Sequence, residues 1–251
     1  MTRGVFARSK RVIFFDLNGT LLDREASFQQ AFQRTWDDVV GRWADENKPT
    51  GKALWERYAS HWQRYRVNRK KRTTDLESRR RACLDETLRS YEIEWKDTML
   101  RSFFGKVKEE QVRTPVLRSG ALETVADLSK RYTLGIISNV AKPQQVAILA
   151  ATGLKPYFRE EHLISAKSAG LRKPNPAVYQ RALTKLNIRP DQAVMVGNSY
   201  SADCLGAIRA SMDAVWIHPR HNKKCSRRKV GSSHIYIIRR FGQLKELFRQ
   251  D

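Results

Sequence analysis

Four short polar segments of the chain carry the side chains that a phosphoryl transfer would need. Each segment lies at the end of an apolar stretch, or in a loop between two such stretches. The side chains are Asp16, Ser138, Asn139, Lys173, Asn198 and Asp203. A carboxylate can attack phosphorus, a hydroxyl and an ammonium can hold the non-bridging oxygens, and the remaining acid can help to hold Mg²⁺. The residue types therefore indicate phosphoryl transfer, provided that the fold brings them together.

Short apolar strands alternate with helices around these residues. Strands are predicted over residues 11–16, 132–138, 163–165, 193–196, 214–217 and 235–238. Helices are predicted over 120–131, 143–151, 176–186, 202–210 and 241–248, and a basic loop over 220–229. This alternation predicts an α/β fold, a doubly wound parallel sheet with helices on both faces. Ligands bind outside the carboxyl ends of such strands, so we expect the polar segments to meet at that edge.

The region after the first strand has the period of helices instead. Apolar residues recur at helical spacing from about residue 27 to 107, for example Phe28, Phe32 and Trp36. We predict an all-helical cap domain over residues 24–111, inserted into a core formed by 1–23 and 112–251. The aromatic residues of the stripes, which include Trp62 and Tyr65, are expected to pack inside this domain.

The order and spacing of the polar segments resemble the haloacid dehalogenase superfamily, in its branch of phosphatases with a helical cap after the first strand. Residues 16–22, Asp-Leu-Asn-Gly-Thr-Leu-Leu, resemble the first motif of that family, usually DxDGTL. Ile137-Ser-Asn139 resembles the second motif and Lys173-Pro-Asn-Pro176 the third. Gly197-Asn-Ser-Tyr-Ser-Ala-Asp203 resembles the fourth, usually GDSxxND. The resemblance covers about residues 11–248.

The resemblance implies a role for each matched residue. Asp16 would be the nucleophile that forms an aspartyl-phosphate, and Thr20 would orient the first loop. Ser138 and the backbone of Asn139 would bind phosphoryl oxygens, and Lys173 would neutralise the nucleophile and the phosphate. The implied Mg²⁺ ligands are Asp16, the backbone carbonyl of Asn18, Asn198 and Asp203. The implied function is that of a Mg²⁺-dependent phosphatase of a small phosphorylated metabolite.

Two positions depart from the family pattern. Asn18 stands where the family's phosphatases have an Asp that protonates the leaving group and then activates water. Loss of such general acid–base help costs about 10²–10⁴-fold. Either the substrate has a good leaving group, or another group or water supplies the proton, or the chain is a catalytically weak phosphate- or nucleic-acid-binding protein. Asn198 also replaces an Asp but keeps an oxygen ligand for Mg²⁺. A 2-haloacid dehalogenase is a less favoured alternative.

The charge of the chain is unusually positive. The 251 residues include 48 Lys or Arg against 26 Asp or Glu, a formal charge of +22. The segment from Arg57 to Arg81 inclusive has ten basic and two acidic residues, and the segment from Arg220 to Lys229 inclusive has six basic residues. Such runs suit nucleic acid or another polyanion, but a solvated basic surface is the favoured interpretation.

The remaining composition bears on location. The three cysteines, Cys83, Cys204 and Cys225, form neither a disulfide framework nor a CxxC pair, which favours a reducing cytoplasm. The apolar stretch near the N-terminus, residues 12–15, is too short for a signal peptide or a membrane span. We therefore expect a cytoplasmic protein without a membrane partner. The sequence does not indicate an oligomeric state.

Overall fold

The computed structural model describes residues 4–7, 9–41, 48–67, 75–166, 171–223 and 225–249. The chain divides into two compact units. The α/β unit comprises Met1–Arg24 and Pro115–Asp251, and the helical unit comprises Glu25–Thr114. None of the described helices has the length and apolar composition needed to span a bilayer.

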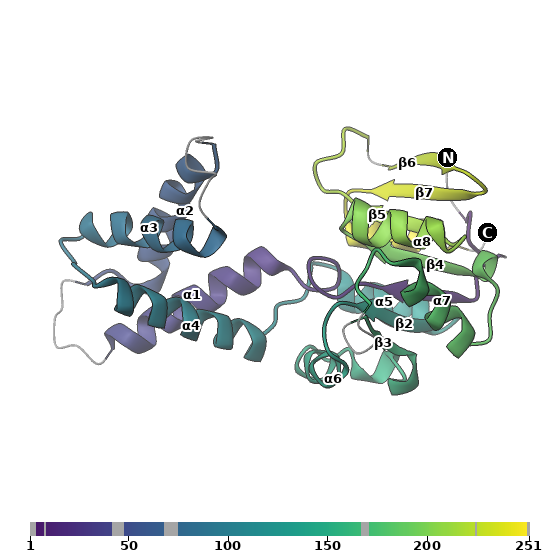
Figure 1. The fold of residues 1–251 in the computed structure, drawn as a ribbon, viewed down its shortest axis with the longest axis horizontal. Helices are drawn as coiled ribbons and strands as arrows, with labels where there is room; N and C mark the ends of the chain where they lie inside the picture. Colours follow the sequence, from purple (N-terminus) through teal and green to yellow (C-terminus); the bar gives the residue numbers. More distant parts are fainter. Residues whose placement is uncertain are drawn as a thin grey trace. The chain divides into compact units, whose positions relative to one another are not determined.

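A seven-stranded sheet forms the centre of the α/β unit. The strands are β1 (Val12–Phe15), β2 (Thr133–Ser138), β3 (Leu163–Ser165), β4 (Ala193–Gly197), β5 (Asp213–Ile217), β6 (Cys225–Val230) and β7 (Ser233–Ile238). Their order is β3-β2-β1-β4-β5-β7-β6, and every pairing is parallel except that of β6 with β7 (Figure 1). The predicted α/β fold with a doubly wound parallel sheet is confirmed, with one antiparallel strand at its edge.

The prediction of a loop over residues 220–229 is wrong for its second half. Cys225–Val230 form the edge strand β6, which a two-residue loop joins to β7. Gly231 begins that loop with φ +61°, a left-handed conformation that glycine adopts easily in tight hairpins. Edge strands tolerate charge because much of their surface faces water, and the cations of β6 hid the strand from the apolar pattern.

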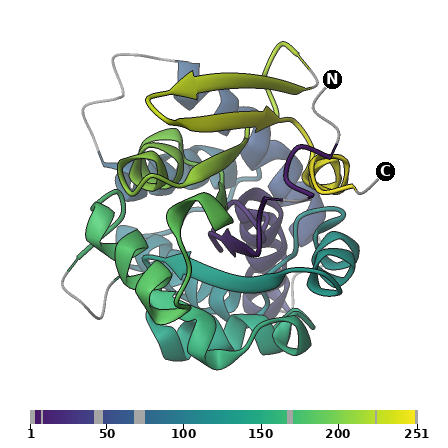
Figure 2. The same cartoon turned by 90° about the vertical axis from the view of Figure 1, so that its right-hand side faces the viewer.

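Helices cover both faces of the sheet (Figure 2). They are α5 (Ala121–Ser129), α6 (Lys142–Ala151), α7 (Pro176–Lys185), α8 (Gly206–Arg209) and α9 (Leu244–Leu247). Helical turns of the 3₁₀ or π type are η2 (Lys155–Tyr157), η3 (Glu160–His162), η5 (Pro190–Gln192), η6 (Tyr200–Leu205) and η7 (Phe241–Gln243).

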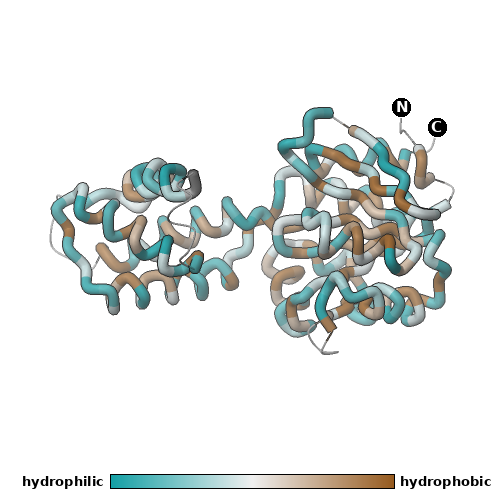
Figure 3. Tube along the Cα trace, turned by 45° about the horizontal axis from the view of Figure 1, so that its top comes forward, coloured by the Kyte–Doolittle hydropathy of each residue, from teal (hydrophilic) through white to brown (hydrophobic). Residues whose placement is uncertain are grey.

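The sheet divides the apolar core of this unit into two clusters. Ile13 and Phe15 of β1 pack on the side of α5, α6 and α9, while Val12 and Phe14 pack on the side of α7 and α8. This is the alternation of a strand that is buried on both faces. Hydrophobic stretches accordingly run through the strands of this unit in Figure 3. The two buried faces fix the register of β1, and with it the position of Asp16 at the strand's end.

The helical unit has its own core. Its helices are α1 (Arg24–Val40), α2 (Gly51–Val67), α3 (Leu76–Arg89) and α4 (Asp97–Arg113). The ring of Phe32 lies 4.8 Å from that of Tyr58 and 5.1 Å from that of Phe103, and Trp36 is fully buried. Phe28 and Tyr65 are buried and Trp62 is half-buried. The expectation that these aromatic residues pack inside the unit is therefore confirmed.

Candidate functional site

Three of the predicted site segments lie at one edge of the sheet, because they end neighbouring parallel strands. Asp16 directly follows β1, Ser138 ends β2, and Asn198 directly follows β4. β1 pairs with β2 on one side and with β4 on the other. The order of the strands therefore gathers segments that are at least 60 residues apart in the sequence.

Lys173 joins the site from the connection between β3 and α7. Its Nζ lies 2.7 Å from Asp16 Oδ1 and 2.6 Å from Asp203 Oδ1. The three residues are only 7%, 8% and 1% exposed, respectively. One ammonium group thus pairs with two buried carboxylates, which leaves a formal charge of −1 among the three side chains.

Burial and pairing together shift the pKa values of Lys173 and Asp203. Burial alone would lower the pKa of Lys173, but the carboxylates of Asp16 and Asp203 outweigh burial and raise it above the usual value. Burial raises the pKa of Asp203, and Lys173 opposes this effect. Lys173 therefore stays charged at neutral pH, held between the two carboxylates.

The loop after β1 connects Asp16 to Asn198. The hydroxyl of Thr20 lies 3.3 Å from Asp16 Oδ2 and 3.3 Å from Asn198 Oδ1. Gly19 has φ +87°, and a Cβ there would lie 2.6 Å from Asn198 Nδ2. The loop thus requires glycine both for its conformation and for its close approach to Asn198.

Arg118 holds the same loop from a distant part of the sequence. Its Nη2 donates to the carbonyl of Gly19 at 2.5 Å, and its Nε donates to the carbonyl of Thr20 at 3.0 Å. Both bonds orient the loop that carries Thr20. The sequence analysis missed Arg118, and no local pattern around residue 118 could have indicated contacts with residues about a hundred positions away.

Asp203 lies in a π-helical turn, η6, where a continuous helix over 202–210 is predicted. Its Oδ2 accepts a hydrogen bond from the backbone N of Ser199 at 2.9 Å. A Cβ on Gly197 would lie 2.2 Å from Asp203 Cγ, so this position has room only for glycine. The wider π turn draws the carboxylate back against the end of β4; such turns are frequent at functional sites.

Tyr179 supports this turn from α7. Its ring is fully buried, and its hydroxyl donates to the main-chain carbonyl of Ala202, next to Asp203. Burial raises the pKa of Tyr179, and the charge of Asp203 adds to this effect, so the hydroxyl remains a donor at neutral pH. Tyr179 is a second positioning residue that the sequence analysis missed, because its position fits the apolar face of α7.

The side-chain hydrogen bonds of the second motif, Ser138 and Asn139, are to main-chain N–H groups of the described residues and not to the carboxylates of Asp16 and Asp203. Ser138 is buried at the end of β2, and its Oγ accepts from the backbone N of Val140 at 3.4 Å. The side-chain oxygen of Asn139 accepts from the backbone N of Lys173 at 3.0 Å. The side chain of Asn139 thus fixes the main chain that presents Lys173, whereas the prediction concerned its backbone. Asn18, by contrast, is exposed in the loop after β1.

The donor atoms of the site suit a small hard cation. Two carboxylates, Asp16 and Asp203, lie against one ammonium group, and the amide oxygen of Asn198 reaches the same group of residues through Thr20. Mg²⁺ prefers oxygen ligands of this kind. Within the described ranges, no three His, Cys, Asp or Glu side chains cluster as a metal site. A metal held here would therefore depend on amide and main-chain oxygens as well as on the two acids.

The segment that carries all of these residues matches a known protein family. A model of the haloacid dehalogenase-like hydrolases matches residues 10–211. The chain belongs to the haloacid dehalogenase-like hydrolase family. All four motif segments lie inside the match, whereas β5, β6 and β7 lie beyond it.

Relatives in the family include named phosphatases. The glyceraldehyde 3-phosphate phosphatase of Pyrococcus furiosus is 26% identical over 216 residues, which cover 83% of this chain and 81% of that protein. The enzyme of the same name from Methanothermobacter thermautotrophicus is 33% identical over 117 residues, or 45% of this chain. That second match spans about half of the relative, 51% of its length.

A solved structure in the family shares the fold. The HAD-hydrolase YfnB from Bacillus subtilis, determined with bound magnesium, aligns with a TM-score of 0.59 at 19% identity. The alignment covers 96% of this chain and 99% of that one.

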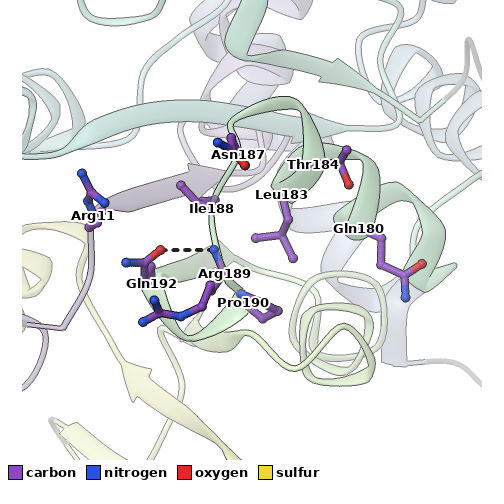
Figure 4. Close-up of a pocket in the computed structure, with 9 residues that line it drawn as sticks. All are labelled: Arg11, Gln180, Leu183, Thr184, Asn187, Ile188, Arg189, Pro190 and Gln192. Carbon is purple, nitrogen blue, oxygen red and sulfur yellow. Dashed lines mark hydrogen bonds between the residues drawn. The ribbon is translucent and has the colours of Figure 1, made fainter.

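A cavity of about 650 Å³ lies away from this family site (Figure 4). Arg11, which precedes β1, and Gln192, which precedes β4, line it, so it lies at the amino edge of the sheet. The side-chain oxygen of Gln192 accepts from the backbone N of Arg189 at 3.2 Å. The cavity does not include any of the predicted site residues.

The two basic segments differ in how much of them is described. Residues 68–74, in the middle of the segment Arg57–Arg81, lie outside the described residues. The segment Arg220–Lys229 is described except for residue 224, and it includes part of the connection from β5 to β6 and most of β6 itself.

Proposed function

We propose that the chain is a Mg²⁺-dependent phosphatase that acts on a small phosphorylated metabolite through an aspartyl-phosphate on Asp16. The observation that carries the proposal is Lys173, which is buried between Asp16 and Asp203 at 2.7 and 2.6 Å. A buried cation beside a buried carboxylate can hold both the nucleophile and the incoming phosphoryl group. The named phosphatases among the relatives support this reaction class.

Asp16 presents its second carboxylate oxygen for attack. Oδ1 pairs with Lys173, whereas Oδ2 has a longer contact, 3.3 Å, with the hydroxyl of Thr20. In the first step a bond forms between Oδ2 and phosphorus, and the bond from phosphorus to the leaving oxygen breaks. In the second step water attacks phosphorus and passes a proton to the solvent, the bond between Oδ2 and phosphorus breaks, and inorganic phosphate leaves as the carboxylate is restored.

The other residues bind and orient. Lys173 stays charged and offsets the negative charge of the phosphoryl oxygens, while Ser138 and the backbone of Asn139 bind those oxygens. A bound Mg²⁺ would be held by Asp16, the carbonyl of Asn18, Asn198 and Asp203, and it would offset charge on the phosphoryl group. The helical unit would serve as the cap that selects the substrate. A reducing cytoplasm suits the three cysteines, none of which forms a disulfide in the described structure.

Asn18 sets the preference among substrates in this proposal. An amide cannot donate a proton to the leaving oxygen at neutral pH, so that proton must come from water or from another group. Substrates with good leaving groups, such as acyl phosphates or aryl phosphates, need this help least. We therefore expect faster turnover of these substrates than of simple alkyl phosphates.

A panel of phosphorylated metabolites, assayed for phosphate release with and without Mg²⁺, tests the proposal. We expect release that depends on Mg²⁺ and is lost in Asp16→Asn, which keeps the size of the side chain but removes the nucleophilic charge. Release that persists undiminished in Asp16→Asn would reject the mechanism. Halide release from a 2-haloacid without Mg²⁺ would replace the proposal with dehalogenation.

A further inference from the structure

A row of aromatic rings leads away from the candidate site along the carboxyl edge of the sheet. We call Tyr200, Trp216, His218 and His221 the aromatic row. The ring centres of Tyr200 and Trp216 are 5.0 Å apart, those of Trp216 and His218 are 4.4 Å apart, and those of His218 and His221 are 6.0 Å apart. The row begins in η6 and runs into the connection between β5 and β6.

The near end of the row is bonded to the site itself. The indole Nε1 of Trp216 donates to the main-chain carbonyl of Asn198 at 3.0 Å. Tyr200 lies three residues before Asp203 in the same π turn. A ligand that reached Asp16 along this edge would therefore meet these rings first.

The rings are accessible as well as packed. All four side chains are half-buried, and Tyr200 and Trp216 rest on the apolar cluster beneath α7 and α8. A rigid, partly exposed ring is the kind of surface on which a nucleobase stacks, and such stacking does not depend on base identity.

Positive charge accompanies the row. Arg220 and Lys223 are exposed in the connection that also holds His218 and His221. Arg228 of β6 lies on the same face of the sheet as Trp216, because Trp216 pairs with Ile237, Ile237 pairs with Ser226, and side chains two positions apart share a face. Between Asp213 and Glu246 the sequence has nine Lys or Arg and no acid.

Protection of the sheet edge explains only part of this arrangement. Cations on β6 would prevent pairing of the edge strand with another chain. That role requires no aromatic rings, and Arg220 and Lys223 precede the strand. The connection between β5 and β6 lies at the end of the sheet where β1 also ends, which is the edge of the candidate site (Figure 1).

We propose that the aromatic row and the cations Arg220, Lys223 and Arg228 form a binding surface for single-stranded nucleic acid that delivers a terminal phosphate to Asp16. Bases stack on the rings, and the cations contact the backbone phosphates. A duplex does not fit this surface, because its bases are stacked on one another. The delivery of the phosphate rests on the proposed phosphatase activity, whereas binding of the strand does not.

The binding experiment uses the full chain with Asp16→Asn, so that a phosphorylated probe is not consumed. Fluorescence anisotropy measures the affinity for a short single-stranded oligothymidylate at increasing salt. Arg220→Ala/Lys223→Ala should weaken binding about tenfold and reduce the slope of log K against log[salt] by about 1.4, since each lost phosphate contact removes about 0.7. Arg181→Ala/Lys185→Ala removes two exposed cations of α7 and is the matched control.

The aromatic row has its own variants. His221→Ala and Trp216→Leu should each weaken binding of the oligothymidylate about five- to a hundredfold, the range for loss of one base–ring stack. Trp216→Phe retains a ring and should recover most of the affinity, which separates stacking from damage to the fold. Equal binding of a duplex of the same length, or equal losses in the α7 control, would overturn the proposal. Binding to phosphatidylserine vesicles but not to the oligothymidylate would overturn it as well.

The turnover experiment uses the unmodified chain and the same oligothymidylate with a phosphate at its 5′ end, at its 3′ end or at neither. We expect phosphate release from one phosphorylated end, with a KM at least tenfold below that of a thymidine mononucleotide. Release from an aryl phosphate without binding of the strand rejects this surface and leaves the phosphatase intact. Strand binding without release from any substrate rejects the phosphatase and the delivery of a phosphate.

Discussion

The sheet has a buried lysine at each edge, and the two lysines differ in the number of carboxylates with which they pair. At the amino edge, the Nζ of Lys10 lies 2.7 Å from Asp213 Oδ2 and donates to the main-chain carbonyl of Asp191 at 2.6 Å. At the carboxyl edge, Lys173 lies between two carboxylates, Asp16 and Asp203. The ion pair of Lys10 joins it to one carboxylate, that of Asp213, and is neutral, whereas the group around Lys173 keeps an excess negative charge.

The difference shows what each edge is built to hold. The pair of Lys10 and Asp213 is neutral and needs no further ion. Lys10 therefore has a structural role, since it joins the start of β1 to η5 and β5. The group of Lys173, Asp16 and Asp203 becomes neutral or positive only when a further cation binds to its carboxylate oxygens. Buried charge left in this state is typical of a ligand site.

Lys173→Met should have the largest effect. Loss of the ammonium removes the charge that would stabilise the phosphoryl oxygens, so we expect kcat/KM to fall by at least about 10²–10³-fold. Steady-state phosphate release measures this change, and circular dichroism checks that the chain is folded. A folded Lys173→Met variant with full activity would show that Lys173 has no role in phosphoryl transfer.

Lys10→Met should act on stability instead. It leaves the carboxylate of Asp213 without its buried partner, so we expect a loss of about 3 kcal/mol in the free energy of unfolding. Urea denaturation measures the loss, and the exposed Lys130→Met is the matched control. Activity per folded molecule should be unchanged. A drop in kcat for the folded fraction would show that Lys10 also affects the activity, and not the stability alone.

Asn18→Asp should raise activity, because it supplies the missing proton donor at an exposed position of the first loop. We expect an increase of about 10- to 100-fold on an alkyl phosphate and a smaller one on an aryl phosphate, whose leaving group needs less help. Comparison of the two substrates in one preparation tests the reason as well as the size of the change. An equal gain on both would point to a cause other than proton donation.

Asn198→Asp should have the smallest effect. An additional carboxylate at the carboxyl edge strengthens the attraction for Mg²⁺, so half-maximal activity should require about three- to tenfold less Mg²⁺. Asn187→Asp adds the same charge beside the amino-edge cavity and should leave the Mg²⁺ requirement unchanged. Equal shifts in both variants would mean that overall charge, and not the site, governs Mg²⁺ binding.

Features that depend on continuous apolar runs were predictable from the sequence. The central strands are buried on both faces, so each appears as an unbroken apolar stretch, and the residues that follow them are the candidate site. This reasoning located Asp16, Ser138 and Asn198 at strand ends. The resemblance of the third and fourth motifs to those of the family indicated Lys173 and Asp203.

Features that depend on distant contacts were not predictable. β6 is a polar strand that is recognised only once β7 is present as its partner. The π turn at Asp203 differs from an α-helix over six residues, too few for the apolar period to distinguish. Arg118 and Tyr179 act through main-chain carbonyls far away in the sequence, and carbonyls carry no sequence signal. The roles inferred for the motif residues remain predictions.

The central claim is that Asp16 accepts the phosphoryl group, and mass spectrometry of the acid-quenched reaction tests it most directly. After brief exposure to a phosphorylated substrate and Mg²⁺, we predict one phosphoryl group on the peptide that contains Asp16. Hydroxylamine should release it, and Asp16→Asn should not acquire it. Turnover in which this peptide remains unmodified at every quench time, or in which the phosphoryl group appears on another residue, would contradict the account.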